Sequence, residues 1–263
     1  MHATDITPLV LSYNEEPNLR RTLERLTWAP EIVLLDSFSS DATLEIARSY
    51  PNVRIVQRTF DNHTAQWNFG LDQVNTDWVL ALDADYVLSP ELAVELQSLT
   101  TNSDVVSYYS RFRYCVNGRP LRGSLYPPRA VLFRRTVCRY ASDGHTQLLN
   151  VGGPSKFLRG VIYHDDRKPL SYWLAAQERY ARLEAEQLLA RPVRELRPQD
   201  RIRRYILIAP LFVPFYILLG KGLILDGWRG WCYTLQRTYF ELLLSLLLLE
   251  AKLLSCRRLV PPA

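Results

Sequence analysis

The chain has 263 residues, enough for one large domain or for one domain with an appendage. Hydrophobic residues make up 48% of it, so a full core is available. The formal net charge of +5 favours an anionic partner without choosing between a nucleotide, a phospholipid and a nucleic acid. Because the basic residues are scattered or lie beside apolar stretches, and no nucleic-acid-binding motif occurs, we expect no nucleic-acid partner.

The first hundred residues alternate between strand-like and helix-like segments. Apolar strands are predicted at 6–13, 31–36, 53–58 and 77–83, and helices at 14–26, 39–50 and 64–74. Ser40 or Asp41 is expected to cap the second helix. This rhythm predicts an α/β fold with a mostly parallel sheet flanked by helices. Irregular strands are expected at 105–118 and 131–141, and a further strand ends at His164.

Carboxylates and a hydroxyl follow three of these strands. Ligands of such sheets bind beyond the carboxyl ends of the strands, so we expect Ser12, Asp36 and Asp83 to meet at one edge. The last strand ends in D-A-D, which adds Asp85. Two neighbouring carboxylates repel each other, and a hard divalent ion such as Mg²⁺ or Mn²⁺ relieves that repulsion. The alternative is a solvated turn, or a cap before the S-P-E-L segment that follows.

Three segments carry a specific resemblance: TPLVLSYNEEPNLRRTLERL, then IVLLDSFSSDATLEIA, then AQWNFGLDQVNTDWVLALDADYVLSPEL. In this order they resemble the nucleotide-sugar domain of family 2 glycosyltransferases, which have the Rossmann-like GT-A fold. The match covers residues 5 to about 165. DGHTQLL (143–149) and YHDDRKPLSYWLAAQERYARLEAEQL (163–188) resemble the lipopolysaccharide-core glucosyltransferase branch. We therefore expect a catalytic domain at 1–167 and a helical region at 168–263.

The resemblance implies roles on the donor side of the site. Leu11 and Ser12 match the segment that lines the base and ribose, and Glu15 matches a nucleotide contact. Asp36 matches the carboxylate that receives uracil or ribose, and Asn68 matches the donor-side asparagine. The alternatives are a turn-capping role for Asp36 and an ordinary helix-surface amide for Asn68. By family habit the donor is expected to be a UDP-sugar.

The metal side of the site follows from the same resemblance. Asp85 matches the principal ligand of Mg²⁺ or Mn²⁺, and Asp83 matches a ribose-side or metal-side aspartate. His164, at the end of a strand-like run, is a candidate third metal ligand. The alternative is a histidine whose hydrogen bonds serve only the structure. Arg129 and Arg134 are candidates for phosphate contact, or else solvated.

The reaction implied by the family is a single displacement that inverts the anomeric carbon. It needs one general base for the acceptor hydroxyl and no covalent nucleophile. We expect a turn before a helix start in SDGHTQLL to present Asp143 as the base, with His145 as the second choice. The alternatives are a turn or capping role for Asp143 and a backbone hydrogen bond for His145.

The C-terminal region is amphipathic and in part strongly apolar. Residues 205–220 carry no charge, but Pro210 and Pro214 interrupt them, and the stretch is shorter than the roughly 20 residues of a spanning helix. We expect these helices to lie on a membrane, with Trp228, Trp231 and Tyr233 at the interface. The alternative is a soluble helical hairpin that packs on the catalytic domain or forms a homo-oligomer.

A membrane-held enzyme implies a lipid-linked glycan as acceptor, at the cytoplasmic face of the inner membrane, with a peripheral or monotopic attachment. The function expected is sugar transfer to a hydroxyl in cell-envelope or lipopolysaccharide synthesis. Two alternatives stand beside it. One is a polyprenyl-phosphate sugar synthase, whose acceptor is the lipid phosphate. The other is a non-catalytic protein that binds nucleotide-sugars.

Overall fold

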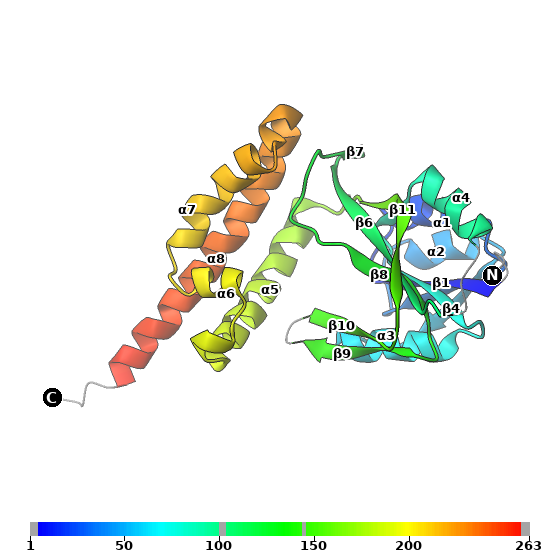
Figure 1. The fold of residues 1–263 in the computed structure, drawn as a ribbon, viewed down its shortest axis with the longest axis horizontal. Helices are drawn as coiled ribbons and strands as arrows, with labels where there is room; N and C mark the ends of the chain where they lie inside the picture. The colour runs from blue at the N-terminus through cyan, green and yellow to red at the C-terminus, as the bar shows by residue number, and fades with distance from the viewer. Residues whose placement is uncertain (1–4, 100–103, 144–145, 259–263) are drawn as a thin grey trace. The chain divides into compact units, whose positions relative to one another are not determined.

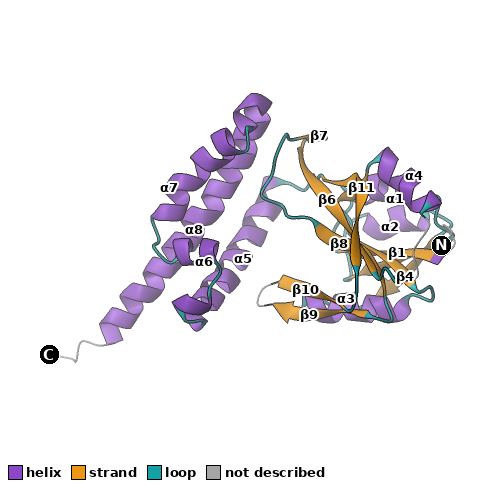
Figure 2. Cartoon of the chain, in the orientation of Figure 1, coloured by secondary structure: helices purple, strands orange, loops and turns teal. Residues whose placement is uncertain are grey.

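The computed structural model describes residues 5–99, 104–143 and 146–258, without the side chains of 142–147 and 255–258. The chain divides into two compact units. The first comprises Met1–Pro120 and Leu125–Lys168, and the second Leu121–Ser124 and Pro169–Ala263. The strands of the described residues belong to the first unit, and the second is helical (Figure 2).

A curled mixed sheet forms the centre of the first unit (Figure 1). Its strands are β1 (Ile6–Ser12), β2 (Ile32–Asp36), β3 (Val53–Gln57), β4 (Trp78–Asp83), β5 (Tyr86–Leu88), β6 (Ser107–Val116), β7 (Arg119–Pro120), β8 (Arg129–Arg134) and β11 (Ser155–His164). The order is β3-β2-β1-β4-β8-β6-β11-β5, with β7 beside β6. The first four strands are parallel, as predicted, whereas β8 runs antiparallel to both neighbours and β5 runs antiparallel to β11.

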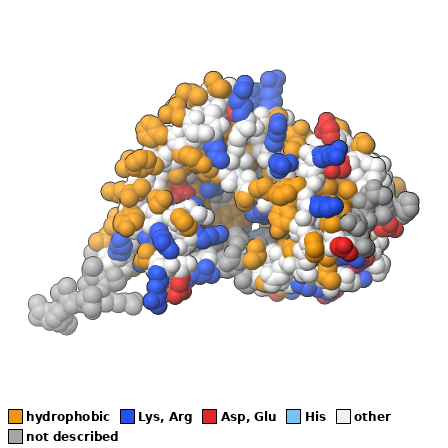
Figure 3. Space-filling view, viewed as in Figure 1, with side chains coloured by type: hydrophobic (Ala, Val, Ile, Leu, Met, Phe, Trp, Pro, Cys, Tyr) orange, Lys and Arg blue, Asp and Glu red, His pale blue; other side chains and the backbone are white. Residues whose placement is uncertain are grey.

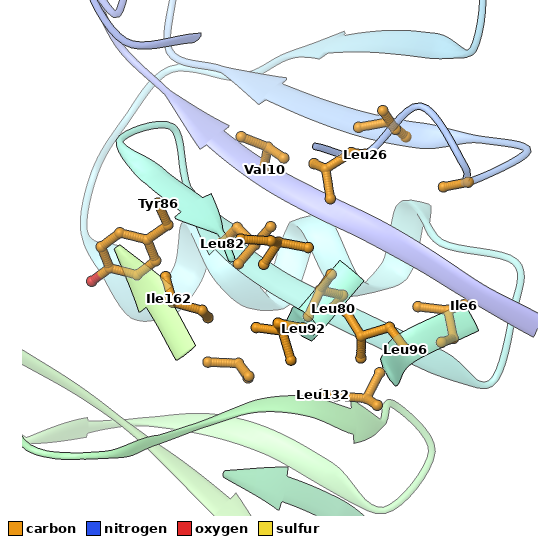
Figure 4. Close-up of a cluster of buried hydrophobic side chains, with 14 of the residues drawn as sticks. Ile6, Val10, Leu26, Leu80, Leu82, Tyr86, Leu92, Leu96, Leu132 and Ile162 are labelled. Atoms are coloured by element: carbon orange, nitrogen blue, oxygen red, sulfur yellow. The ribbon is translucent and has the colours of Figure 1, made fainter. Parts of the chain in front are cut away.

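Successive side chains of the parallel strands point to opposite faces of the sheet and pack in two separate hydrophobic cores. The helices are α1 (Leu19–Glu24), α2 (Thr43–Arg48), α3 (His63–Gln73) and α4 (Pro90–Ser98). On β1, Ile6 and Val10 pack in the core under α1, α2 and α4, while Leu9 packs in the core under α3. Leu80 and Leu82 of β4 join the first of these cores (Figure 4). Helices therefore cover both faces of the sheet, which confirms the predicted fold class.

Some local predictions were wrong. The helix over 39–50 is α2, which is shorter, and its cap residue is Ala42. Asp41 instead accepts a hydrogen bond from the Thr43 backbone N–H at 3.0 Å. The strand expected at 131–141 is two strands, β8 and β9 (Cys138–Asp143). The helix expected in SDGHTQLL is strand β10 (Thr146–Val151), which pairs with β9 as a hairpin.

The second unit is a set of helices with its own small core. Its elements are α5 (Leu170–Ala190), η2 (Val193–Glu195), α6 (Pro198–Arg203), α7 (Ile208–Phe215), η3 (Tyr216–Gly220), η4 (Leu223–Asp226) and α8 (Trp228–Arg258). Its buried core residues are Ala181, Ala185, Leu188, Leu196, Phe240, Leu244 and Leu248. Within the described residues, every helix is too short or too polar to cross a membrane.

Gly160 lets β11 lie directly against α4. A Cβ at this position would come within 2.5 Å of Leu92 Cα, and backbone atoms cannot move aside as a flexible side chain can. We predict that Gly160→Ala lowers the free energy of unfolding by about 1–3 kcal/mol in urea denaturation. Lys156→Ala, at an exposed position of the same strand, should change it by less than about 0.5 kcal/mol. Equal stability of the two variants would contradict this packing.

Candidate functional site

Three parallel strands end together at one edge of the sheet. β1 and β2 pair with Ser12 opposite Asp36, and β1 and β4 pair with Leu11 opposite Asp83. Segments that are far apart in the sequence therefore bring their polar residues to one place. This is the edge at which sheets of this kind bind ligands.

Asp36 is fully buried and anchors the loop that follows β2. Ser12 Oγ donates to its Oδ1 over 3.0 Å, and the Ser39 hydroxyl donates to the same oxygen. The Ser39 backbone N–H and Gln57 Nε2 donate to Oδ2 over 2.8 and 3.3 Å. A carboxylate has about four lone-pair sites, so all of them are in use. A ligand hydroxyl would have to replace one donor, and Gln57 makes the longest of these bonds.

The loops after β1 and β2 are fastened to each other. The Asn14 backbone N–H donates to Ser39 Oγ over 2.8 Å, and Asn14 Oδ1 accepts from the Ser40 N–H over 2.8 Å. The Glu15 N–H donates to Thr43 Oγ1 over 2.7 Å. Asn14 has a φ of +51°, in the left-handed region that asparagine adopts more readily than most residues. The N-E-E loop therefore has a fixed position beside the Asp36 loop.

Asp83 and Asp85 form a partly buried pair with opposite pKa shifts. Burial, and then the negative charge of Asp85, raise the pKa of Asp83, while Arg129 opposes the shift. Burial also acts to raise the pKa of Asp85, but the charge and hydrogen bond of His164 help to lower it below its usual value. Asp85 thus keeps its charge while Asp83 takes up a proton more readily. Mg²⁺ and Mn²⁺ use one or two protein carboxylates together with phosphate oxygens, and this pair fits that chemistry.

His164 is the hydrogen-bond partner of Asp85. Its Nε2 lies 3.0 Å from Asp85 Oδ2, and the rings of Tyr86, Tyr114 and Tyr126 pack edge to face around it at 5.1–5.2 Å between centroids. Burial acts to lower the pKa of His164, but the charge and hydrogen bond of Asp85, together with the charges of Asp83 and Asp166, raise it above its usual value. The buried Nδ1 has no hydrogen-bond partner among the described residues. No group of three His, Cys, Asp or Glu side chains in that part of the chain is arranged to hold a metal ion, so the third-ligand role of His164 stays a prediction.

A second polar cluster, which sequence reasoning missed, follows β11 directly. Buried Asp165 pairs with Arg21 on α1 at 2.5 Å and with Arg167 at 2.8 Å. Asn18 Oδ1 accepts from the Arg167 backbone N–H over 2.9 Å. The Asp165 N–H donates to the Asp85 carbonyl over 3.1 Å. This cluster therefore ties the start of α1 and the end of β11 to the turn that carries Asp85.

Glu15 belongs to the same cluster. Its carboxylate pairs with Lys168 Nζ at 2.5 Å and accepts from Asn18 Nδ2 over 2.8 Å. Burial, and then the charge of Asp85, raise the pKa of Glu15 to about 8 against the opposing charge of Lys168. The role shown for Glu15 is to join the N-E-E loop to the segment after β11, and its predicted contact with a nucleotide stays a prediction.

Asn68 on α3 clamps the β9 strand. Its Nδ2 donates to the Tyr140 carbonyl over 2.9 Å, and its Oδ1 accepts from the Tyr140 N–H over 3.0 Å. Nearby, Gln66 accepts from Arg58 Nη1 over 2.6 Å and donates to Ser37 Oγ over 3.1 Å. The donor contact predicted for Asn68 stays a prediction, and the contact shown is this backbone clamp.

The two candidates for the general base come at, and two residues after, the end of β9 in the sequence. Asp143 is the last residue of β9 and lies opposite Thr146. The side chain of Asp143 and the whole of His145 lie outside the described residues. The choice between them therefore stays as it was predicted from the sequence.

The two arginines near β8 lie in different places. The Arg129 guanidinium lies 4.7 Å from the centre of the Tyr126 ring, and its charge acts on Asp83. Arg134 lies over the ring of Trp78 at 5.2 Å, and Trp78 is the first residue of β4. Arg134 is therefore at the end of β4 opposite to the carboxylate turn.

Sequence comparisons identify similar proteins. The family model described as Glycosyl transferase family 2 matches residues 9–161. Over 266 residues the chain is 24% identical to the lipopolysaccharide core biosynthesis glycosyltransferase LpsC of Rhizobium meliloti (strain 1021), an alignment that covers 96% of this chain and 94% of LpsC. Over 100 residues it is 35% identical to the undecaprenyl-phosphate 4-deoxy-4-formamido-L-arabinose transferase of Photorhabdus laumondii, covering 33% of this chain and 30% of that protein.

Solved structures with a similar fold include two with bound nucleotide-sugars. The mannosyltransferase PcManGT of Pyrobaculum calidifontis, in complex with GDP-Man and Mn²⁺, has a TM-score of 0.53 at 16% identity, covering 95% of this chain and 87% of that one. TarS of S. aureus, in complex with UDP-GlcNAc, has a TM-score of 0.52 at 16% identity, covering 92% and 82%. At these identities the likeness concerns the fold, and it confirms the GT-A arrangement predicted from the sequence.

The raised pKa of Glu15 predicts a pH-dependent stability. The native pKa of about 8 exceeds the ordinary value of 4.5, so the folded chain binds more protons than the unfolded chain between these values. The contribution of Glu15 is therefore most favourable below 4.5 and is lost as the pH rises to about 8. Glu15→Gln has no proton to lose, so its unfolding free energy should rise relative to the unmodified chain across this window, by a few kcal/mol at most.

Urea denaturation at a series of pH values, in the presence of a chelator, measures this difference. Glu16→Gln removes the same charge at the next, exposed position and should follow the pH profile of the unmodified chain. Parallel profiles for Glu15→Gln and the unmodified chain would show that Glu15 stays ionised in its pair with Lys168.

Proposed function

Since the chain belongs to glycosyl transferase family 2, we propose that it is an inverting, metal-dependent enzyme that uses a nucleotide-sugar donor. The acceptor is a hydroxyl of a membrane-linked glycan, in the assembly of a lipopolysaccharide core. The observation that carries the proposal is the partly buried turn with Asp83 and Asp85, at the edge where Asp36 also lies. The similarity to LpsC along nearly the whole chain supports the acceptor class.

In this proposal the donor, expected to be a UDP-hexose, lies on the ends of β1 and β2. Leu11 and Ser12 line its base and ribose, and Asp36 accepts a hydrogen bond from the nucleoside. A ligand hydroxyl or imide N–H that replaces the 3.3 Å bond from Gln57 leaves the Asp36 carboxylate with four donors. The bonds between the loops after β1 and β2 hold this surface in place before a donor binds, which lowers the cost of ordering it.

Asp85 and Asp83 are the residues that would hold Mg²⁺ or Mn²⁺. When bound, such an ion neutralises the charge that builds on the diphosphate as the sugar leaves. His164 keeps Asp85 ionised and fixes the direction of its carboxylate through the 3.0 Å hydrogen bond. The three tyrosine rings around His164 leave its side chain 19% exposed and that of Asp85 15% exposed, so the electrostatic effect of this bond is stronger than at a fully exposed site.

The acceptor hydroxyl loses its proton to a base on the face of the sugar opposite the leaving group. Asp143 is the first candidate and His145 the second. The clamp between Asn68 and Tyr140 holds the strand that ends in Asp143, which supports a defined position for that residue. A positioned base is worth about 10²–10⁴-fold in rate.

One observation favours a second candidate function. The 35% identity to an undecaprenyl-phosphate transferase over 100 residues is compatible with an acceptor that is itself a lipid phosphate. A phosphate is already anionic at neutral pH and needs no general base. The two functions therefore differ in what they require of Asp143.

The proposal predicts that Asp85→Asn removes activity without unfolding the chain. Transfer of label from UDP-sugars and GDP-sugars in the presence of Mn²⁺ should fall by roughly 100-fold or more, because contact with the metal is worth several kcal/mol. The Mn²⁺-dependent thermal shift with UDP or GDP should also disappear. Asp72→Asn, at a side chain that is 60% exposed on α3, should leave both unchanged. A chain that shows no metal-dependent nucleotide shift with either nucleotide would rule the function out.

The variant Asp143→Asn distinguishes a hydroxyl acceptor from a lipid-phosphate acceptor. If the acceptor is a hydroxyl, transfer should fall by about 10²–10⁴-fold while the nucleotide-dependent thermal shift stays as in the unmodified chain. If the acceptor is a lipid phosphate, transfer to undecaprenyl phosphate should be unaffected. Binding of nucleotide with no transfer to either acceptor would indicate a non-catalytic protein.

A further inference from the structure

Most of the exposed large hydrophobic side chains among the described residues lie in the second unit. Of 33 such exposed residues among those described, 26 lie within Pro169–Ala263. The apolar hairpin, as we name residues 205–235, consists of α7, η3, η4 and the start of α8. Figure 3 shows hydrophobic side chains gathered along α7 and the segment after it. Eight side chains of the hairpin are more than 60% exposed: Tyr205, Leu207, Leu211, Phe212, Phe215, Leu219, Leu225 and Leu235.

One cluster of charged side chains, by contrast, lies inside this unit. Arg203 donates to Glu184 over 2.9 Å and to Glu241 over 2.7 Å, and lies 3.4 Å from Asp200. The three acidic residues are each at most 5% exposed. A unit surrounded by water gains free energy from the opposite arrangement, with Leu and Phe inside and ion pairs outside. Soluble monomers rarely expose contiguous apolar patches larger than a few hundred Å².

The charge of the chain is concentrated in the same unit. Residues 169–263 carry 14 Lys and Arg against 8 Asp and Glu, which gives +6. Residues 1–168 carry 18 against 19, which gives −1. Around the turn of the hairpin, Lys221 Nζ lies 5.5 Å from the Tyr216 ring and the Arg229 guanidinium lies 4.7 Å from the Trp228 ring. Aromatic and basic side chains in this combination are typical of the membrane interface next to anionic headgroups.

The length of the hairpin limits how deep it reaches. α7 and η3 run without a break from Ile208 to Gly220, which at 1.5 Å per residue is about 20 Å. The hydrocarbon core of a bilayer is about 30 Å thick. Gly222 and Gly227, with φ of +71° and +58°, then turn the chain back into α8. The hairpin has the dimensions to enter one leaflet.

We propose that the apolar hairpin inserts into one leaflet of a membrane that contains anionic lipid. The occupant of this surface is the bilayer, because the surface combines outward apolar side chains with a local excess of positive charge. The inference goes beyond the proposed function, which it would serve by bringing the enzyme to a lipid-borne acceptor at the cytoplasmic face. Vesicle binding does not depend on that function.

Sedimentation of the full chain with phosphatidylcholine vesicles, with and without phosphatidylglycerol, tests the proposal. The unmodified chain should bind the anionic vesicles, and more weakly at high salt. A double variant with Phe212→Glu and Phe215→Glu should bind at least about 10-fold more weakly, because two apolar anchors are lost. Val94→Glu on α4, at a residue 65% exposed against 67% for Phe212, is the matched control and should bind as the unmodified chain does.

A second variant tests the electrostatic contribution to vesicle binding. Lys221→Gln together with Arg229→Gln should reduce the preference for phosphatidylglycerol by about fivefold per charge and leave binding to neutral vesicles unchanged. Asp85→Asn should bind vesicles like the unmodified chain, so loss of the proposed function is distinguishable from loss of membrane binding. Nucleotide-dependent thermal shifts of the Phe212 and Phe215 double variant should be unaltered.

Two outcomes would overturn the proposal. One is equal vesicle binding by the double variant and the unmodified chain. The other is an unmodified chain that ignores vesicles but sediments as a dimer without lipid, with the double variant a monomer. The second result would show that the apolar hairpin is a contact between two copies of this chain.

Discussion

The site depends on one hydrogen bond, between Asp85 and His164. Two carboxylates on a single, partly buried turn repel each other, and desolvation favours the neutral form of both. The imidazole 3.0 Å from Asp85 reverses this for one of them, so that the turn retains a charged carboxylate to offer a cation. The sheet makes the bond possible: β5 and β11 pair antiparallel with Tyr86 opposite His164, which places a histidine from the end of the domain next to a turn about 80 residues earlier.

The polar cluster around Asp165 and Glu15 joins three segments near the Asp85–His164 pair by hydrogen bonds and ion pairs. Asp165 binds Arg21 and the Asp85 carbonyl, and Glu15 binds Lys168, so the N-E-E loop, the carboxylate turn and the end of β11 share their hydrogen bonds. Removal of one partner would leave a buried charge unpaired, which costs far more than the pair contributes. A geometry fixed in this way suits catalysis, since charged groups that already point at the leaving group need not reorganise during the reaction.

The parallel half of the sheet and one edge of the site could be predicted because their signals are local. Leu80, Leu82 and Asp83 lie in one short apolar run, and the carboxyl ends of parallel strands meet whatever the rest of the chain does. The antiparallel half could not be predicted in register, because β8 is inserted between β4 and β6 by pairings that no short segment encodes. The helix expected after Asp143 was wrong for a related reason: cross-strand pairing with β9 outweighs a turn signal that fits either structure.

The pairing of Asp165 with Arg21 was missed because Arg21 lies 144 residues away on α1, and the four charges of DDRK alone do not identify it as a partner. In the second unit, similarly, the sequence shows apolar and charged residues but not which face inward. If the apolar hairpin enters lipid, its exposed side chains cannot contribute to the core of the second unit. Other interactions must then stabilise the interior of that unit. The small core around Ala185 and Leu244 and the ion cluster of Arg203 supply those interactions. Membrane affinity and folding stability then depend on different side chains, so substitutions on the apolar hairpin can change the first without changing the second.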